Sequence, residues 1–196
     1  YALKKTGPGQ TATANAVELA GAKTILVDVN RKNLLIDEKD LLKKISKKTK
    51  AIVPVHLSGR GSNIKNILKI AKRKKLYVIE DAAEAFMSKN GNKYLGTFGH
   101  AGCFSFAPNK IITTGQGGIV VTNNKLIHKK ILRLKDQGRV GITTGGEDNY
   151  VSIGYNFKFT NLQSALGLAQ LKNIKQRVDI LKNHYKFYKK HLIQNK

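Results

Sequence analysis

Acidic side chains follow directly after the apolar run Tyr77-Val78-Ile79, in the segment Glu80-Asp81-Ala82-Ala83-Glu84-Ala85. A carboxylate is costly to bury unless a cation or a hydrogen-bond donor meets it. Acidic residues at the end of an apolar strand therefore indicate a ligand site. The alternative is structural, with Asp81 as the N-cap of a following helix. The residues alone leave both interpretations open.

A lysine stands between an apolar run and a glycine-rich turn. The segment Phe104-Ser105-Phe106-Ala107-Pro108-Asn109-Lys110 precedes Thr113-Thr114-Gly115-Gln116-Gly117-Gly118. In a partly buried pocket the amine would lose hydration, its pKa would fall, and it could attack an aldehyde. The alternative is an exposed lysine in a turn. The glycine spacing matches neither the dinucleotide fingerprint nor the P-loop, which excludes a nucleotide cofactor bound in either way.

The third polar segment is Gly154-Tyr155-Asn156-Phe157-Lys158-Phe159-Thr160-Asn161-Leu162-Gln163. It leads into a long helical pattern, with Thr160 or Asn161 as the expected cap. The five histidines show no metal-ligand spacing, and we expect them to be structural or on the surface. Cys103 is the only cysteine, which excludes an intramolecular disulfide and a cysteine-rich zinc site. We expect no metal.

Short apolar strands alternate with helices along the chain. Apolar strands that do not alternate with polar residues, separated by helices, favour a mostly parallel sheet covered by helices on both faces. The predicted fold class is therefore α/β, and the carboxyl ends of its strands are where ligands bind. The predicted strands are 24–28, 51–55, 77–79, 103–106 and 119–121; the predicted helices are 37–45, 63–72, 126–134 and 162 onward, with a loop over 139–149. Asp37 is the expected N-cap of the first helix. The 63–72 helix has an apolar face of Ile64, Ile67, Leu68 and Ala71, and the last helix has an apolar stripe of Leu166, Ala169, Leu171 and Ile174.

The bulk composition predicts one domain over residues 1–196 and no membrane span. A chain of 196 residues that is 41% hydrophobic can bury one ordinary core. We expect a cytoplasmic protein. The net charge of +24 suggests nucleic-acid binding, but only six of the 36 basic residues are arginine and the lysines are dispersed. We therefore expect no nucleic-acid partner; salt-sensitive binding that ignored the cofactor would support one.

Together these segments resemble the DegT/DnrJ/EryC1/StrS family of aminotransferases, which have the fold-type I architecture of pyridoxal-phosphate (PLP) enzymes. The resemblance covers nearly the whole chain and implies a PLP-binding large domain. It includes the three segments above together with Thr13-Ala14-Asn15-Ala16, Val27-Asp28-Val29, Thr49-Lys50-Ala51-Ile52-Val53-Pro54-Val55-His56-Leu57, Gly96-Thr97-Phe98-Gly99 and Val121-Thr122-Asn123.

The resemblance also implies roles for single residues. Lys110 matches the lysine that forms a Schiff base with the cofactor aldehyde and then moves a proton. Asp81 matches the carboxylate that pairs with the pyridine nitrogen and keeps the ring an electron sink. Ser105 matches a hydroxyl on the cofactor phosphate. Glu84 stands where relatives more often carry Gln or His, facing the ring and its phenolic oxygen.

Two further positions match a segment that enters the neighbouring subunit's site near the cofactor phosphate. They are Asn156 and Lys158, the latter where many members have arginine, so a bidentate contact is in doubt there. The resemblance thus implies a homodimer. A Ser-Gly-Thr turn and an aromatic-bearing strand that relatives place upstream, and their C-terminal small domain, have no counterpart. We therefore expect a large domain truncated at both ends.

The implied reaction transfers an amino group from L-glutamate to a nucleotide-linked keto-deoxy sugar. The segments around Asp81 and Lys110 look most like the branch acting on 4-keto-6-deoxy sugars, which includes perosamine synthases. A rival in the same fold is a pyridoxamine-phosphate-dependent sugar dehydratase, which Lys110 argues against because those relatives carry histidine there. From a different class, the chain could be a non-catalytic homologue that keeps the fold and binds the sugar nucleotide or PLP without turnover.

Overall fold

The computed structural model describes residues 2–4, 11–140 and 149–193. The chain divides into two compact units. The first contains the residues up to Ser105 together with Gly118–Lys158, and the second contains Phe106–Gly117 together with the residues from Phe159 onward. The prediction of a single domain stays a prediction.

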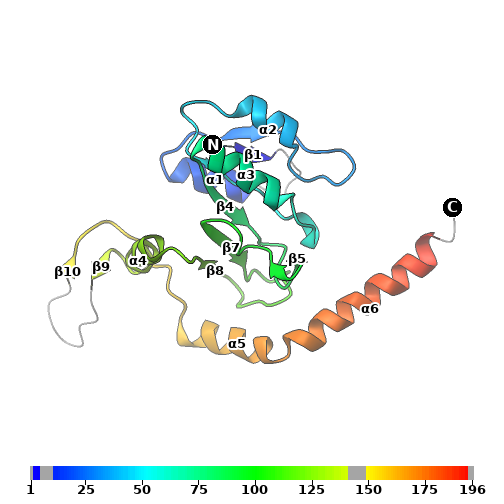
Figure 1. Ribbon diagram of the computed structural model, residues 1–196. Helices are drawn as coiled ribbons and strands as arrows, with labels where there is room; N and C mark the ends of the chain where they lie inside the picture. Colours follow the sequence, from blue (N-terminus) through cyan, green and yellow to red (C-terminus); the bar gives the residue numbers. More distant parts are fainter. Residues whose placement is uncertain (1, 5–10, 141–148, 194–196) are drawn as a thin grey trace. The chain divides into compact units, whose positions relative to one another are not determined.

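A six-stranded sheet forms the first unit, in the order β2-β1-β3-β4-β7-β8 (Figure 1). Every neighbouring pair is parallel except β7 and β8, which are antiparallel. This confirms the predicted mostly parallel sheet of an α/β fold. The strands are β1 (Ala2–Lys4), β2 (Ile25–Val27), β3 (Ala51–Ile52), β4 (Tyr77–Asp81), β7 (Ala101–Ser105) and β8 (Gly118–Val121).

Polar side chains cap two helices of this unit, α2 and α4. Asp37 accepts hydrogen bonds from the backbone N–H groups of Lys39 and Asp40, which confirms it as the predicted N-cap. Asn124 caps its helix in the same way. The helices are α1 (Thr11–Leu19), α2 (Glu38–Lys44), the short 3₁₀ helix η1 (Leu57–Gly59), α3 (Ile64–Lys74) and α4 (Lys125–Leu134).

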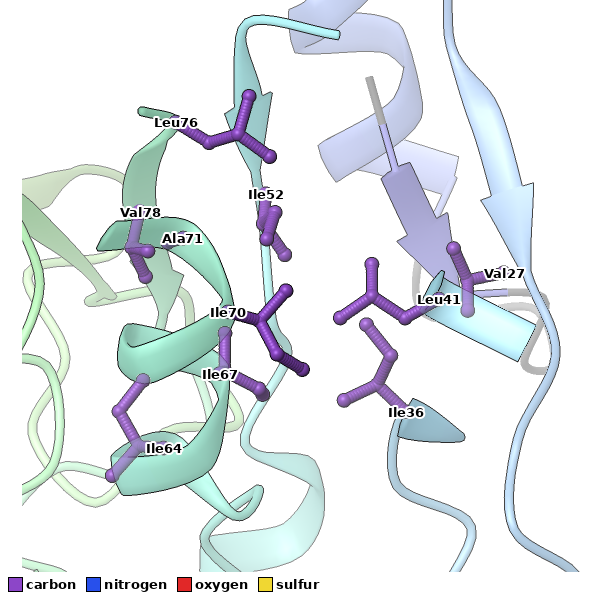
Figure 2. Packing of buried hydrophobic residues seen from close by; sticks show 10 residues of the cluster. All are labelled: Val27, Ile36, Leu41, Ile52, Ile64, Ile67, Ile70, Ala71, Leu76 and Val78. Atoms are coloured by element: carbon purple, nitrogen blue, oxygen red, sulfur yellow. The ribbon is translucent and has the colours of Figure 1, made fainter. Parts of the chain in front are cut away.

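The main core lies between the sheet and helices α2 and α3 (Figure 2). Helix α3 turns Ile64, Ile67 and Ile70 inward at intervals of three residues, and all three are buried. They pack with Val78 of β4 and with residues of β2, β3 and α2. The predicted apolar face of the 63–72 helix is thereby confirmed, and it fixes the position of β4.

Two small antiparallel hairpins complete the first unit. Strand β5 (Lys89–Asn90) pairs with β6 (Lys93–Tyr94), and β9 (Arg139–Val140) pairs with β10 (Asn149–Tyr150). The loop predicted over 139–149 therefore has paired ends, while its central residues 141–148 lie outside the described part of the chain.

The second unit joins the Phe106–Gly117 segment to two helices, α5 (Asn161–Lys172) and α6 (Ile174–Ile193). Thr160 caps α5 through a capping box with Gln163, which confirms Thr160 as the cap. Most of the apolar stripe predicted on these helices is exposed, and only its last member, Ile174, is buried. No helix among the described residues is long and apolar enough to cross a membrane.

Candidate active site

Asp81 and Ser105 end two neighbouring parallel strands. Strand β4 ends at Asp81, and β7 ends at Ser105. Asp81 lies opposite Cys103 in the ladder, so Ser105 lies two residues further toward the same edge. This is the carboxyl edge of the parallel strands, where open α/β sheets bind ligands. The structure thus brings these two predicted residues to one edge.

The carboxylate of Asp81 is held by two donors. Its Oδ2 accepts a short hydrogen bond from the Thr13 hydroxyl of α1, and its Oδ1 accepts from the Ala83 backbone N–H at 3.1 Å. Residues 82–88 form turns and no helix, so the N-cap alternative for Asp81 is wrong. The half-buried carboxylate keeps lone pairs for a further donor. Thr13 is thereby added to the site; its segment is part of the family resemblance, but no role was predicted for it.

Glu84 is exposed and binds the segment that follows β3. Its Oε2 accepts the backbone N–H of Ser58 at 2.9 Å. Ser58 adopts a left-handed conformation, with φ +50°, inside η1. Glu84 therefore joins the turn after β4 to the turn after β3, at the carboxyl side of both strands.

Lys110 lies on a closed loop in the second unit. The loop is closed where the Phe106 N–H donates to the Gly117 carbonyl and the Thr114 N–H donates to the Phe106 carbonyl, at 2.9 and 3.0 Å. Within it, the Lys110 backbone N–H donates to the Ala107 carbonyl at 3.0 Å. Lys110 itself is half-buried. Its amine is thus carried by a defined backbone and not by a simple exposed turn.

Helices α5 and α6 anchor this loop by side-chain hydrogen bonds. The Gln170 amide donates to the Thr113 carbonyl at 2.6 Å and accepts the Thr113 N–H at 3.2 Å. The Arg177 guanidinium donates to the Ile111 carbonyl at 3.2 Å. The loop that bears Lys110 is therefore held at Ile111 and Thr113 by the helices that follow it in the chain.

Asn156 and Lys158 lie beside the end of α4. Asn156 forms an isolated antiparallel bridge with Asp136. The Lys158 ammonium lies 2.9 Å from the Asp136 carboxylate, with the two side chains 46% and 22% exposed. The ion pair was not predicted, because nothing in the local spacing connects residues 136 and 158. The role inferred for Asn156 and Lys158 in a neighbouring subunit stays a prediction.

A buried histidine–carboxylate hydrogen bond lies on the other side of β4 from Asp81. Glu80 and His56 are both fully buried, and His56 Nε2 lies 2.8 Å from Glu80 Oε2. Burial alone raises the pKa of Glu80, but the hydrogen bonds from His56, Gly99 and Gly96 outweigh it and leave the pKa below its usual value. Glu80 is therefore an ionised carboxylate inside the fold. His56 is structural, as predicted, but its acidic partner was missed.

The single thiol of the chain is held protonated. Burial, and then the negative charge of Asp81, raise the pKa of Cys103 to about 11. Cys103 is therefore unsuited to act as a nucleophile near neutral pH. Across residues 2–4, 11–140 and 149–193, no three His, Cys, Asp or Glu side chains are grouped so that they could hold a metal ion.

The fold is that of solved sugar aminotransferases with the fold-type I architecture. Helicobacter pylori PseC, described as an aminotransferase involved in the biosynthesis of pseudoaminic acid, superposes with a TM-score of 0.82 at 35% identity, over 89% of this chain and 46% of that one. A variant of GDP-4-keto-6-deoxymannose-3-dehydratase with bound GDP-perosamine superposes with a TM-score of 0.86 at 25% identity, over 95% and 52% of the two chains.

The chain belongs to the DegT/DnrJ/EryC1/StrS aminotransferase family, whose sequence pattern matches residues 9–196. The GDP-perosamine synthase of Escherichia coli O157:H7 is 41% identical over 181 residues, which are 92% of this chain and 49% of that protein. The chain thus spans about half the length of the curated relatives it matches.

Proposed function

We propose that the protein is a PLP-dependent aminotransferase that moves an amino group from L-glutamate to a nucleotide-linked keto-deoxy sugar. The observation that carries the proposal is the half-buried Asp81 carboxylate at the carboxyl edge of the sheet, held by Thr13 and Ala83. Membership of the aminotransferase family supports it independently. The GDP-perosamine synthases among the relatives support a nucleotide-sugar substrate.

The residues at this edge fit a pyridine cofactor that carries a phosphate. A carboxylate can accept a hydrogen bond from a proton-bearing ring nitrogen, and Asp81 presents a carboxylate with lone pairs beyond those that Thr13 and Ala83 use. Ser105 offers a hydroxyl two positions further along the neighbouring strand. Lys110 follows Ser105 by five residues, on the loop that α5 anchors. The edge therefore offers a carboxylate and a hydroxyl, and the sequence supplies the amine of Lys110 five residues later; these are the kinds of group that PLP requires.

When bound, PLP supplies the electron sink for removing and adding a proton at the amine-bearing carbon. Asp81 would hold the proton on the ring nitrogen, because its negative charge favours the cationic ring. Ser105 would donate to the phosphate. The Lys110 amine would hold the cofactor covalently. Once the amino donor has displaced it, the free amine would carry the proton between the substrate carbon and the cofactor carbon. Glu84, beside Ser58, would face the ring and its phenolic oxygen.

The remaining parts of the proposal rest on the family resemblance and on the bulk composition of the chain. Asn156 and Lys158 would reach the cofactor phosphate of a second copy in a homodimer, and the protein would be cytoplasmic. The high net charge of +24 is compatible with an anionic sugar diphosphate, whose association it would speed. Lys110 supports amination over the dehydration performed by the relative that binds GDP-perosamine.

The test is to add PLP to the chain and record the visible spectrum before and after borohydride reduction. Because the chain has thirty lysines, Lys110→Ala is compared with Lys130→Ala, which removes an exposed lysine of α4. We expect the wild type and Lys130→Ala to show a band that borohydride bleaches, and we expect Lys110→Ala to lack this band. Glutamate should then convert the spectrum to that of the aminated cofactor.

If the band persists in both Lys110→Ala and Lys130→Ala, other lysines carry the cofactor and the role of Lys110 is rejected. A folded wild type without any band would mean that the chain is a non-catalytic homologue.

A further inference from the structure

Four N–H donors converge on the buried carboxylate of Glu80. Oε2 accepts from His56 Nε2 at 2.8 Å and from the Gly96 backbone at 2.9 Å. Oε1 accepts from the Phe98 and Gly99 backbones, each at 2.6 Å. A fully buried carboxylate with two donors on each oxygen is satisfied without a counter-ion. Glu80 therefore binds the turn between β6 and β7 to the end of β4.

The tautomer of His56 follows from its second partner. The Ser62 backbone N–H donates to His56 Nδ1 at 3.2 Å, so Nδ1 is unprotonated. Nε2 is then the nitrogen that donates to Glu80. The Ser62 hydroxyl donates to the Val55 carbonyl at 3.0 Å and holds the turn closed. His56 is thereby a fixed donor to Glu80.

The same histidine holds the backbone of Asp81. The backbone N–H of His56 donates to the Asp81 carbonyl, and the backbone N–H of Asp81 donates to the Pro54 carbonyl, both at 2.9 Å. Glu80 fixes the ring of His56, and the main chain of His56 fixes Asp81. The turn from Gly96 to Gly99 lies directly against β4, because a Cβ added at Gly99 would lie 2.6 Å from the Val78 carbonyl oxygen.

Alternation along β4 separates the two carboxylates. Successive side chains of a strand point to opposite faces of the sheet. Val78 and Glu80 are buried on the face that packs against α3, while Asp81 reaches Thr13 of α1. Glu80 therefore cannot touch a ligand bound at Asp81, and any effect it has there passes through the strand.

We propose that Glu80, with His56, is a positioning residue that sets the carboxylate of Asp81 for the ring nitrogen of a pyridine cofactor. The inference rests on the proposed function, since it presumes that Asp81 makes this contact. Glu80 acts by holding three segments at one point: the end of β4, the turn that carries His56 and the turn from Gly96 to Gly99.

The test is a double-mutant cycle on PLP affinity with the full chain, using Glu80→Gln, Asp81→Asn and both together. A glutamine keeps the shape of Glu80 but presents an NH₂ group to two N–H donors. Losing one charge-assisted hydrogen bond should weaken PLP binding about tenfold or more in Asp81→Asn, and Glu80→Gln should weaken it about fivefold. If Glu80 acts through Asp81, the double variant should bind within about twofold of Asp81→Asn.

A control variant separates positioning from general instability. Asp37→Ala removes the N-cap of α2, away from β4 and from the hydrogen bonds of Glu80, and it should keep the wild-type PLP affinity. Independent effects that multiply in the double variant would overturn the inference and leave the proposed function standing. Failure of the wild type to bind PLP, or an Asp81→Asn variant that binds normally, would instead overturn the proposed function and the inference with it.

Amide hydrogen exchange provides a readout that needs no cofactor. The Ala83 N–H donates to Asp81 Oδ1, so it should exchange at least about tenfold faster in Glu80→Gln if Asp81 has moved. The Leu41 N–H, bonded to the Asp37 carbonyl in α2, should be unchanged. If Glu80→Gln does not fold, His56→Gln replaces it and should show a smaller change in the same direction. Unchanged exchange at Ala83 in the folded variant would overturn the inference.

Discussion

Gly117 closes the loop that bears Lys110, and replacing it with alanine should open that loop. Its φ is +128°, a region that residues with a Cβ rarely adopt, and a Cβ there would overlap the ring of Phe159. Gly115 is the matched control: its φ is +78°, and an added Cβ would meet no heavy atom within 4 Å in the described part of the chain. Both substitutions therefore strain the backbone, Gly117→Ala more than Gly115→Ala, and only Gly117→Ala adds an overlap.

The magnitude follows from these two costs. Backbone strain alone should lower the free energy of unfolding by about 1 kcal/mol in Gly115→Ala. In Gly117→Ala the Phe159 ring must also move. The move would break its contact with the ring of Phe106, whose centroid lies 6.1 Å away. Losing such a ring pair costs about 0.5–1.5 kcal/mol, and residual overlap adds to it, so we expect about 2–4 kcal/mol in total.

The assay is urea unfolding of both variants, together with exchange of the Phe106 amide, which donates to Gly117. Exchange at Phe106 should rise much more in Gly117→Ala than in Gly115→Ala. Replacing the ring by a smaller side chain, in Gly117→Ala/Phe159→Leu, should recover part of the additional loss in the free energy of unfolding. If the two glycine variants are equally stable, the overlap does not exist in solution and the reasoning about the loop is refuted.

Three further outcomes can be measured in the first unit. Asp37→Ala removes the cap of α2 and should lower the free energy of unfolding by about 1 kcal/mol, while Asp37→Asn should keep most of it; equal losses would contradict a capping role. Because the pKa of Glu80 is lowered in the fold from 4.5, its stabilisation is present above that pH and is lost as the pH falls through the folded value. Stability measured against pH should therefore fall less steeply below pH 4.5 in Glu80→Gln than in the wild type, and an unchanged acid slope would exclude Glu80 as its source. Cys103, with its pKa raised to about 11, should react with a disulfide reagent at pH 8 about a hundredfold more slowly in the folded chain than in urea; fast labelling of the folded chain would contradict the shift.

Local patterns were sufficient for the elements with strong periodicity or a capping residue. The apolar spacing of α3 and the caps Asp37 and Thr160 predicted their helices. The strand expected over 51–55 is shorter, Ala51–Ile52, because Pro54 has no N–H for the ladder. Helix α1 was missed because it has no buried residue and therefore no apolar face to detect.

The site was only partly predictable, because its contacts join residues far apart in the chain. The position of Asp81 after an apolar strand was visible in the sequence, but its partner Thr13 is 68 residues away. His56 and Glu80 are separated by 24 residues, and nothing in either segment identifies the other. The family resemblance named Lys110, whereas the hydrogen bonds that hold its loop, from Gln170 and Arg177, follow only from the folded helices.

Adjacent acidic residues on one strand make the register of β4 unusually consequential. The register is set on both sides, by Tyr77 opposite Ala51 and by Ile79 opposite Ala101. A slip or single-residue deletion in the strand would exchange the faces of Glu80 and Asp81. Net charge and composition would hardly change. The shorter aspartate would then face the four N–H donors that now bind Glu80, and the longer glutamate would take the place of Asp81 at the edge of the sheet. Selection on this strand should therefore tolerate substitutions at Tyr77 more readily than any change in its length.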